Sequence, residues 1–507
     1  MKKNLLPLVI LVFSYSNSSA QCILDPTFSD SFFNMDGVAI TTVGTSIDNG
    51  DNAVLQSDGK IVVIGETSYN GADYDLVVLR HNADGSLDNS FDTDGIYLFS
   101  FGDGSETIGE EILIQPDGKI LAMGYCSSGA NQGTFVFRLN ADGTLDNSFS
   151  GDGVAAIGMI GGYYLGSGGA ALQTDGKIVV AGAYNNDFGL LRLNTDGSID
   201  NGFGTSGLAF TDLGSVEDVK SVAIHSSGKI LVAGSTNSVS ADFAVARYDT
   251  NGAIDNSFSG DGFETVSLSA SVDMPSDMVV AADGSVYVVG TASSDMQLLK
   301  LSSSGNLDLS FAGDGILSLD IAAGNDVATA VALHPNGYIF MTGPAQHGLV
   351  HYSALACVGT SGNLVTTFGT GGLCILDQVA VETPTNGMFI QPDGKIVVVG
   401  HAVAGPLNEK VMLARYDDQF TGMTETSIGS SIKIFPNPAV SSITIDGIDN
   451  LEGYYLTICD LSGRIVYTEI ITKNEAYFLN IDNLVSGTYS LAIKNETGTQ
   501  TTRFVKQ

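Results

Sequence analysis

The sequence predicts an all-β fold: a seven-bladed β-propeller closed by its N-terminal strand, followed by a small Ig-like β-sandwich. First, one phrase, seen as QPDGKIVVVG at residues 391–400, recurs seven times at intervals of 52 to 59 residues, a repeat length typical of propeller blades. Second, each repeat contains four short apolar segments between turn residues. Third, a piece missing from the last repeat occurs at the start of the chain. The repeat glycines are Gly59, Gly118, Gly176, Gly228, Gly284, Gly337 and Gly394.

Residues 1–20 predict a signal peptide. Two lysines precede an apolar stretch at 5–13, and small residues follow up to Ala20, so we expect cleavage between Ala20 and Gln21. Lipidation of Cys22 is the alternative, but the residue before an acylated cysteine is normally small. No other apolar run approaches the ~18 residues needed to span a bilayer. We expect a soluble, monomeric mature chain, exported through the inner membrane to the outer-membrane surface or the medium.

The second repeat shows how one blade is built. Apolar segments at 111–115, 119–123 and 135–139 predict three strands, and a fourth begins at Gly153. An Asp-Gly turn at 116–118 joins the first two, because glycine supplies the positive φ of a tight hairpin. The strands carry apolar residues on both faces, which favours blades packed face to face.

The ends of the chain indicate a closed ring. Each of six repeats contains the phrase L-D-x-x-F or a close variant of it, at 87–91, 145–149, 199–203, 254–258, 307–311 and 364–368; the first residue is Ile at 199 and 254, and Val365 stands in place of the aspartate. The seventh copy is missing after Tyr416 and is found instead at 24–28, before an apolar strand at 38–43. A ring closes when the first strand completes the last blade and removes the exposed sheet edges.

These phrases resemble the delta-sixty repeat family of bacterial surface and secreted proteins, over residues 21–420. The resemblance implies a propeller-like domain without a common activity. Four places depart from the repeat: Ser227 and Asn336 stand where other copies have Asp, Lys300 where they have Arg, and 347–357 matches poorly.

After a polar stretch at 421–431 that is typical of a linker, residues 432–507 resemble the type A sorting domain of type IX secretion in Bacteroidota. The residues that carry this resemblance are Pro436, Asn437, Pro438, Asp460, Gly463, Gly487, Tyr489 and Lys506. The resemblance implies a small sandwich that the type IX machinery recognises, carries across the outer membrane and usually cleaves off. Short strands at 443–445, 454–459, 464–468, 477–481 and 489–493 fit such a fold. An Ig-like binding domain that stays attached is the alternative.

Charge and motifs exclude several functions. The net charge of −35 disfavours nucleic acid as a partner. The sequence has no G-x-S-x-G elbow, no P-loop and no dinucleotide fingerprint, and we identify no catalytic residue and no organic cofactor. His347 and His351 have a zinc spacing only on a helix; on a single strand they would stand about 13 Å apart.

Residues that recur in every repeat are expected to be structural. Arginines at one repeat position, Arg80, Arg138, Arg192, Arg247 and Arg415, predict ion pairs within or between blades, with Asp75, Asp187 and Asp242 five residues before three of them. The acidic turns offer a calcium site at Asp84, Asp88, Asp142 and Asp146, with hydrogen-bonded Asx turns as the alternative. Cys357 and Cys374 could form a disulfide, or stay buried thiols.

The varied loops lie opposite the Asp-Gly turns and are where we expect a ligand. Their tyrosines, Tyr69, Tyr125, Tyr163, Tyr164 and Tyr184, offer flat contacts suited to a glycan or a protein. The sequence therefore favours a non-catalytic binding or adhesion protein. A secreted polymer-degrading hydrolase or lyase is the alternative, because propellers also support enzymes by loop variation.

Overall fold

The computed structural model describes the chain except for residues 1–22, 30–35, 69–73, 103, 130, 215, 237–240, 271, 322–323, 349, 377–381, 404–408, 418–432, 447–454, 460–464, 472–476, 485–486, 496–497 and 507. The predicted signal peptide, Tyr69, the linker, Asp460 and Gly463 lie outside the described residues. The chain forms two compact units, residues 1–419 and 420–507.

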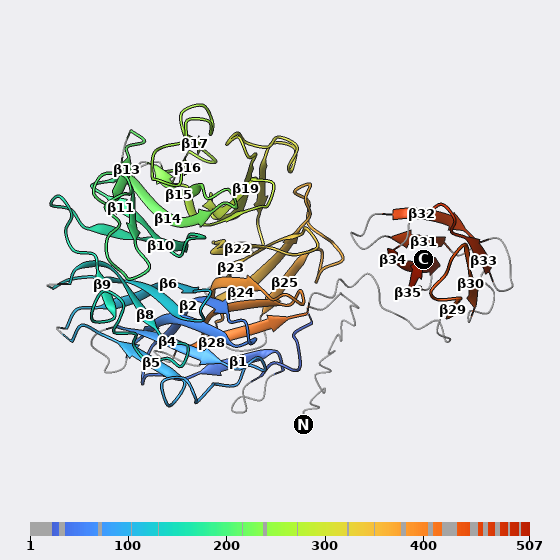
Figure 1. The fold of residues 1–507 in the computed structure, drawn as a ribbon, viewed down its shortest axis with the longest axis horizontal. Helices are drawn as coiled ribbons and strands as arrows, with labels where there is room; N and C mark the ends of the chain where they lie inside the picture. Colours follow the sequence, from blue (N-terminus) through green and yellow to red (C-terminus); the bar gives the residue numbers. More distant parts are fainter. Residues whose placement is uncertain are drawn as a thin grey trace, which may run out of the picture. The chain divides into compact units, whose positions relative to one another are not determined.

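The first unit is a ring of seven four-stranded antiparallel sheets (Figure 1). Blades 1 to 3 consist of β2 (Asp48–Leu55), β3 (Ile61–Thr67), β4 (Asp75–His81) and β5 (Ile96–Phe99); β6 (Thr107–Ile114), β7 (Ile120–Cys126), β8 (Gly133–Leu139) and β9 (Val154–Ala156); β10 (Leu165–Leu172), β11 (Ile178–Tyr184), β12 (Asp187–Leu193) and β13 (Leu208–Thr211). Blades 4 to 6 consist of β14 (Glu217–Ile224), β15 (Ile230–Thr236), β16 (Asp242–Tyr248) and β17 (Phe263–Val266); β18 (Met274–Val280), β19 (Val286–Ala292), β20 (Asp295–Leu301) and β21 (Ile316–Leu319); β22 (Ala330–Leu333), β23 (Ile339–His347), β24 (Val350–Val358) and β25 (Leu373–Leu376).

Blade 7 joins the two ends of the propeller. It contains β26 (Thr385–Ile390), β27 (Ile396–Val403), β28 (Glu409–Tyr416) and, as its outer strand, β1 (Val38–Thr41), which pairs with β28 (Figure 1). Leu24 forms a further bridge to Tyr416, and β26 contacts β2 of blade 1. The predicted closure by the N-terminal strand is confirmed.

The middle strands of each blade are buried on both faces, as predicted. Every residue of β8 is buried, and β3 and β4 each have a single partly exposed position. Their aliphatic and aromatic side chains pack between neighbouring blades, for example Val62 and Val78 of blade 1 against Phe135 and Phe137 of blade 2. Such face-to-face burial of sheets is the main source of stability in an all-β ring.

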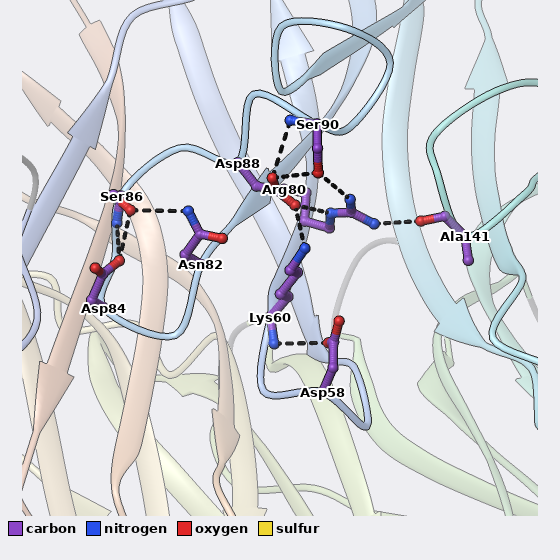
Figure 2. Close-up of polar contacts among 9 residues, drawn as sticks. All are labelled: Asp58, Lys60, Arg80, Asn82, Asp84, Ser86, Asp88, Ser90 and Ala141. Atoms are coloured by element: carbon purple, nitrogen blue, oxygen red, sulfur yellow. Dashed lines mark hydrogen bonds and ion pairs between the residues drawn. The ribbon is translucent and has the colours of Figure 1, made fainter.

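An ion-pair cluster at the end of the third strand links blades 1 to 4 and blade 7 to their neighbours. Figure 2 shows the cluster of blade 1. In blade 1, Asp88 Oδ2 accepts hydrogen bonds from Arg80 Nε at 2.7 Å and Lys60 Nζ at 2.8 Å. The Nη1 of Arg80 donates a hydrogen bond to the carbonyl of Ala141, in the turn after the third strand of blade 2. The guanidinium carbon of Arg80 lies 4.7 Å from the centre of the Phe91 ring. This cluster explains why Lys, Arg and the L-D-x-x-F phrase recur together.

The same cluster closes the ring in blade 7. Arg415 and Lys395 both bind Asp25 of the N-terminal segment, at 2.7 and 2.6 Å, and Arg415 donates to the carbonyl of Ala83 in blade 1 at 2.6 Å. The arginines therefore bind the aspartate of L-D-x-x-F, eight residues later in the internal blades, rather than the aspartate five residues before them.

Blades 5 and 6 depart from this pattern where the sequence does. In blade 5, Lys300 replaces the arginine and binds Asp308 at 2.8 Å. In blade 6 the equivalent positions hold Cys357 and Val365, so two apolar side chains stand where the other blades have the ion pair. Burying apolar groups in place of an ion pair is often neutral for stability.

Of the two alternatives for Cys357 and Cys374, the bridge between them is ruled out, because Cys357 is a buried free thiol. The strand register explains why the two cysteines are not bridged. Cys374 stands directly opposite Leu355, so Cys357, two residues further along the strand, is its diagonal neighbour. Diagonal neighbours lie about 7–8 Å apart, beyond ordinary disulfide reach. The expectation that His347 and His351 share one strand is wrong. They lie on β23 and β24, which are joined by a tight turn where Gly348 has a φ of 69°.

The second unit is a small sandwich of two sheets. One sheet has the order β29 (Lys433–Phe435), β30 (Ser442–Asp446), β33 (Tyr477–Asn480); the other has β32 (Ile465–Ile470), β31 (Tyr455–Cys459), β34 (Gly487–Asn495), β35 (Gly498–Lys506). Side chains of both sheets, such as Ile443, Leu456 and Phe504, share one buried core. None of the described residues forms a helix long and apolar enough to cross a membrane.

Candidate functional site

The loop face of the propeller, opposite the Asp-Gly turns, carries a run of aromatic rings on blade 3. Tyr163, in the loop before β10, is 48% exposed and contacts Tyr184 at the end of β11, with ring centroids 5.8 Å apart. Tyr184 in turn contacts Phe210 of β13, which is 57% exposed, at 5.9 Å. Tyr184 itself is buried and donates a hydrogen bond to the carbonyl of Ile160 at 2.7 Å. We call Tyr163, Tyr184 and Phe210 the aromatic platform.

The other predicted tyrosines are placed differently. Tyr164 is partly buried and lies over Gly133, where a Cβ would come within 3.1 Å of its ring. Tyr125 is a half-buried residue of β7 in blade 2. Phe210 was missed by sequence reasoning, although it occupies the same outer-strand position as Leu98 and Ile375, which are also exposed. An aromatic residue at the solvent-facing position of an outer strand was the available signal.

Three carboxylates lie beside the platform. Asp187 pairs with Tyr184 across the β11–β12 hairpin, Asp212 follows Phe210 by two residues, and oxygens of Asp187, Asp212 and Glu217 lie within 4.8 Å of one another. Burial, and then the charge of Asp212, raise the pKa of Asp187. The platform therefore has an acidic edge.

A second polar feature is the channel inside the inner strands, which the sequence did not reveal. The inner strands of five blades, β2, β6, β14, β18 and β26, shift register at a β-bulge near their middle, and β10 has a similar irregularity. At the bulge, two consecutive residues line the channel instead of one. These residues line a cavity of about 360 Å³. Bulges next to functional sites often change the direction in which a side chain points.

The last glycine of the repeat phrase makes room for this bulge. A Cβ at Gly65 would stand 1.9 Å from the carbonyl oxygen of Asn49, and one at Gly234 would stand 2.0 Å from that of Asp218. Both contacts are far shorter than any side chain tolerates, so only glycine fits. The repeat glycine therefore serves the channel as well as the blade.

The bulge residues place carboxylates in the channel from three blades. Asp51, Glu110, Glu111 and Asp277 line it, with Lys220 as the cationic side chain among the lining residues that the structure describes. Burial raises the pKa of Glu110 to about 7 and that of Glu111 to about 8. Burial, and then the neighbouring Glu66, raise the pKa of Asp51.

The acidic turns proposed for calcium lie on the opposite face and are engaged with protein groups. Although burial opposes it, hydrogen bonds from Lys60 and Ser90 hold the pKa of Asp88 well below its usual range, and Asp146 is held in the same way by Lys119 and Ser148. Asp84 accepts hydrogen bonds from the hydroxyl and amide of Ser86. Asp142 does the same with Thr144. These are Asx turns next to ion pairs, and calcium binding there stays a prediction.

In the C-terminal unit, the described motif residues gather at the last strand. Asn437 Oδ1 accepts a hydrogen bond from Val505 N at 2.9 Å, and Ala439, just after Pro438, bridges to Lys506. Gly487 pairs with Lys506, and Tyr489 pairs with Phe504, whose rings stack at 5.6 Å. Motif pieces about 70 residues apart thus form one local structure.

Comparison with protein families identifies both units. Residues 433–507 match a secretion system C-terminal sorting domain. Residues 56–91, 115–149, 173–203, 225–258, 281–311 and 391–411 match a domain of unknown function (DUF5122) beta-propeller. The unmatched repeat is blade 6, which also lacks the ion-pair cluster. No curated protein matches the chain.

Solved structures resemble the chain only distantly. A protein of unknown function from Dyadobacter fermentans is 12% identical, with a TM-score of 0.39, over 76% of this chain and 100% of that chain. The β-propeller domain of the Trilobed protease from Pyrococcus furiosus is 9% identical, with a TM-score of 0.39, over 73% and 96%. Virginiamycin B lyase from Staphylococcus aureus is 10% identical, with a TM-score of 0.37, over 67% and 91%. Likeness at this level carries no argument about activity.

Proposed function

We propose that this chain, a secreted β-propeller protein that carries DUF5122 repeats and a C-terminal type IX sorting domain, is a non-catalytic binding protein that holds a glycan on the loop face of blade 3. The observation that carries the proposal is the aromatic platform. Two of its rings are about half exposed, and the buried ring between them is fixed by a hydrogen bond.

The platform suits a sugar for physical reasons. Flat, rigid rings offer apolar area at little entropic cost. The neighbouring carboxylates of Asp187 and Asp212 can accept hydrogen bonds from hydroxyl groups, so the apolar and polar contacts lie side by side. A ligand pocket normally combines an apolar lining with a few well-placed polar groups.

The channel carboxyl groups support the alternative of a polymer-degrading enzyme, because glycosidases use a carboxyl group with a raised pKa as the general acid. The size of the channel argues against it: about 360 Å³ holds a small molecule, whereas a polymer chain needs an open groove. Release of reducing sugar from polysaccharides that the protein binds would favour the enzyme.

A glycan array with the full-length protein tests the proposal. For a glycan that binds, Tyr163→Ala with Phe210→Ala should weaken binding at least tenfold without changing the melting temperature by more than a degree or two. Leu98→Ala is the matched control, because Leu98 occupies the position of Phe210 on blade 1 and is 44% exposed. Equal loss in both variants, or none in the double variant, would contradict the proposal.

A further inference from the structure

The central channel has a ligand-binding character of its own, apart from the aromatic platform. Its lining differs from blade to blade: the residue pairs at the bulge position of the repeat are Asp-Asn at 51–52, Glu-Glu at 110–111, Gly-Gly at 168–169, Lys-Ser at 220–221, Ser-Asp at 276–277, Thr-Ala at 329–330 and Asn-Gly at 386–387. Variation at the positions of a repeat scaffold that face a cavity is typical of a specific site.

The channel lining is rich in carboxyl groups. Four of the lining residues are carboxylates, on blades 1, 2 and 5. Lys220 of blade 4 is already paired with Asp218 at 2.8 Å, and both of these side chains are about half exposed. When its carboxyl groups are ionised, the lining therefore carries more negative than positive charge.

Carboxylate oxygens at this site are left without partners. Glu110 Oε2 is buried and accepts no hydrogen bond from the described residues. Asp51 and Glu66 are neighbouring carboxyls whose buried oxygens Oδ2 and Oε2 find no N–H or O–H donor other than a proton that the two carboxyls share. The other groups at the site do have partners: Asn52 donates to Glu111 at 2.9 Å, and Ser221 donates to Asp277 at 3.1 Å. A buried oxygen without a donor is costly, so a cationic donor in the channel would stabilise the site.

A single metal ion does not fit the spacing of the acids. Among the described residues, three carboxylates come within 4.8 Å of one another only at Asp187, Asp212 and Glu217, outside the channel. Metal ligands must surround one ion at about 2.0–2.6 Å. The channel acids are instead spread around a cavity of about 360 Å³, an arrangement that suits a cation with several donor groups spaced along it.

We propose that the central channel binds a small aliphatic diamine or polyamine, with its ammonium groups held by Asp51, Glu110, Glu111 and Asp277. Each ammonium carries three donors and binds carboxylates by charge-assisted hydrogen bonds. Two adjacent lining residues of blade 3, Gly168 and Gly169, have no side chains, which gives room for the methylene chain. This site is independent of the glycan platform on the loop face.

Binding must displace protons. Because burial holds the pKa of Glu110 at about 7 and that of Glu111 at about 8, both acids are partly protonated at neutral pH when no cation is present. The charged groups around them are Asp51 and Glu66 of blade 1, Asp218 and Lys220 of blade 4, and Asp277 of blade 5. An ammonium group lowers the carboxyl pKa values, so protons leave as the ligand enters.

Titration calorimetry of the full-length protein with spermidine at pH 7.5, in two buffers of different ionisation enthalpy, tests the proposal. We expect saturable one-to-one binding with proton release. Affinity should fall at least tenfold in Glu110→Gln with Glu111→Gln and, separately, in Asp277→Asn. Asp58→Asn, in an exposed turn on the other face, is the control and should bind as the wild type does.

Three results would overturn the proposal. The first is the absence of saturable heat in the wild type. The second is equal binding by the channel variants and the wild type, which would mean general attraction to the acidic surface. The third is tighter binding of calcium or magnesium that the same variants abolish, which would make the channel a metal site. Melting curves of the two channel variants establish that each is folded, and loss of glycan binding in the platform variants does not bear on the result.

Discussion

Replacing Asp25 by alanine should weaken the closure of the propeller ring. Asp25 is 2% exposed and is the shared acceptor of Arg415 and Lys395, as well as of the Thr27 hydroxyl at 2.7 Å. These contacts tie the N-terminal segment to blade 7, and Arg415 in turn holds the turn of blade 1. The substitution leaves two cations without their counter-charge at the point where the ring closes.

The expected cost is about 3 kcal/mol, the lower end of the range for removing one partner of a buried ion pair. The lower end applies because Lys395 is 27% exposed and water can partly replace its partner. Unfolding entropy of about 2.1 cal/mol/K per residue over roughly 400 residues converts this loss into a fall in melting temperature of about 4 °C.

Thermal denaturation followed by circular dichroism measures the effect. Asp58→Ala is the control, since Asp58 is exposed in a turn and binds only the amide of Lys60 at 3.2 Å; surface changes of this kind stay within about 0.5 kcal/mol. Equal melting temperatures for the two variants would refute the view that the Asp25 cluster holds the ring closed.

Three further predictions follow from the same structure. The free energy of unfolding should fall by a few kcal/mol as pH rises from about 5 to about 8, because the raised pKa values of Glu110 and Glu111 make the folded state bind more protons than the unfolded one in that window. Denaturant titrations at several pH values should show that this free energy depends less on pH in the Glu110→Gln with Glu111→Gln variant. The same pH dependence in the variant and the wild type would contradict the prediction. Calcium should give neither heat nor a melting shift if the acidic turns are plain Asx turns, whereas a shift lost in Asp84→Asn with Asp142→Asn would establish a calcium site there. Deletion of residues 428–507 should leave a folded propeller that stays in the periplasm because it is not carried across the outer membrane. Surface display that survives the deletion would refute the sorting role.

Sequence reasoning found what repetition makes visible. The L-D-x-x-F phrase at the start of the chain revealed the closing strand. The last repeat lacks this phrase, and an N-terminal copy can complete the last repeat only if the two ends of the array meet in a ring. The C-terminal unit was predicted in outline, but β29 and β35 were missed; β35 begins with the polar run Gly-Thr-Gln-Thr-Thr at 498–502, which lacks the apolar pattern of a buried strand.

The channel was missed for a different reason. In a regular strand, successive side chains point to opposite faces, so Glu110 and Glu111 would be expected to point apart. The register shift between Gly109 and Glu111 places both Glu110 and Glu111 in the channel lining. The sequence of a single repeat does not indicate that shift. Only the combination of two polar residues before an apolar strand end, seen in several repeats, could have indicated it.

Hydrogen exchange of the protein with a bound glycan tests the central claim most directly. Protection on binding should appear at residues 157–164 and 208–213, which carry the aromatic platform of blade 3. Residues 57–60 and 83–88, in the Asp-Gly turns of the opposite face, should exchange as they do without the glycan. Protection of those turns, with no change at 157–164, would place the ligand on the acidic face and contradict the account.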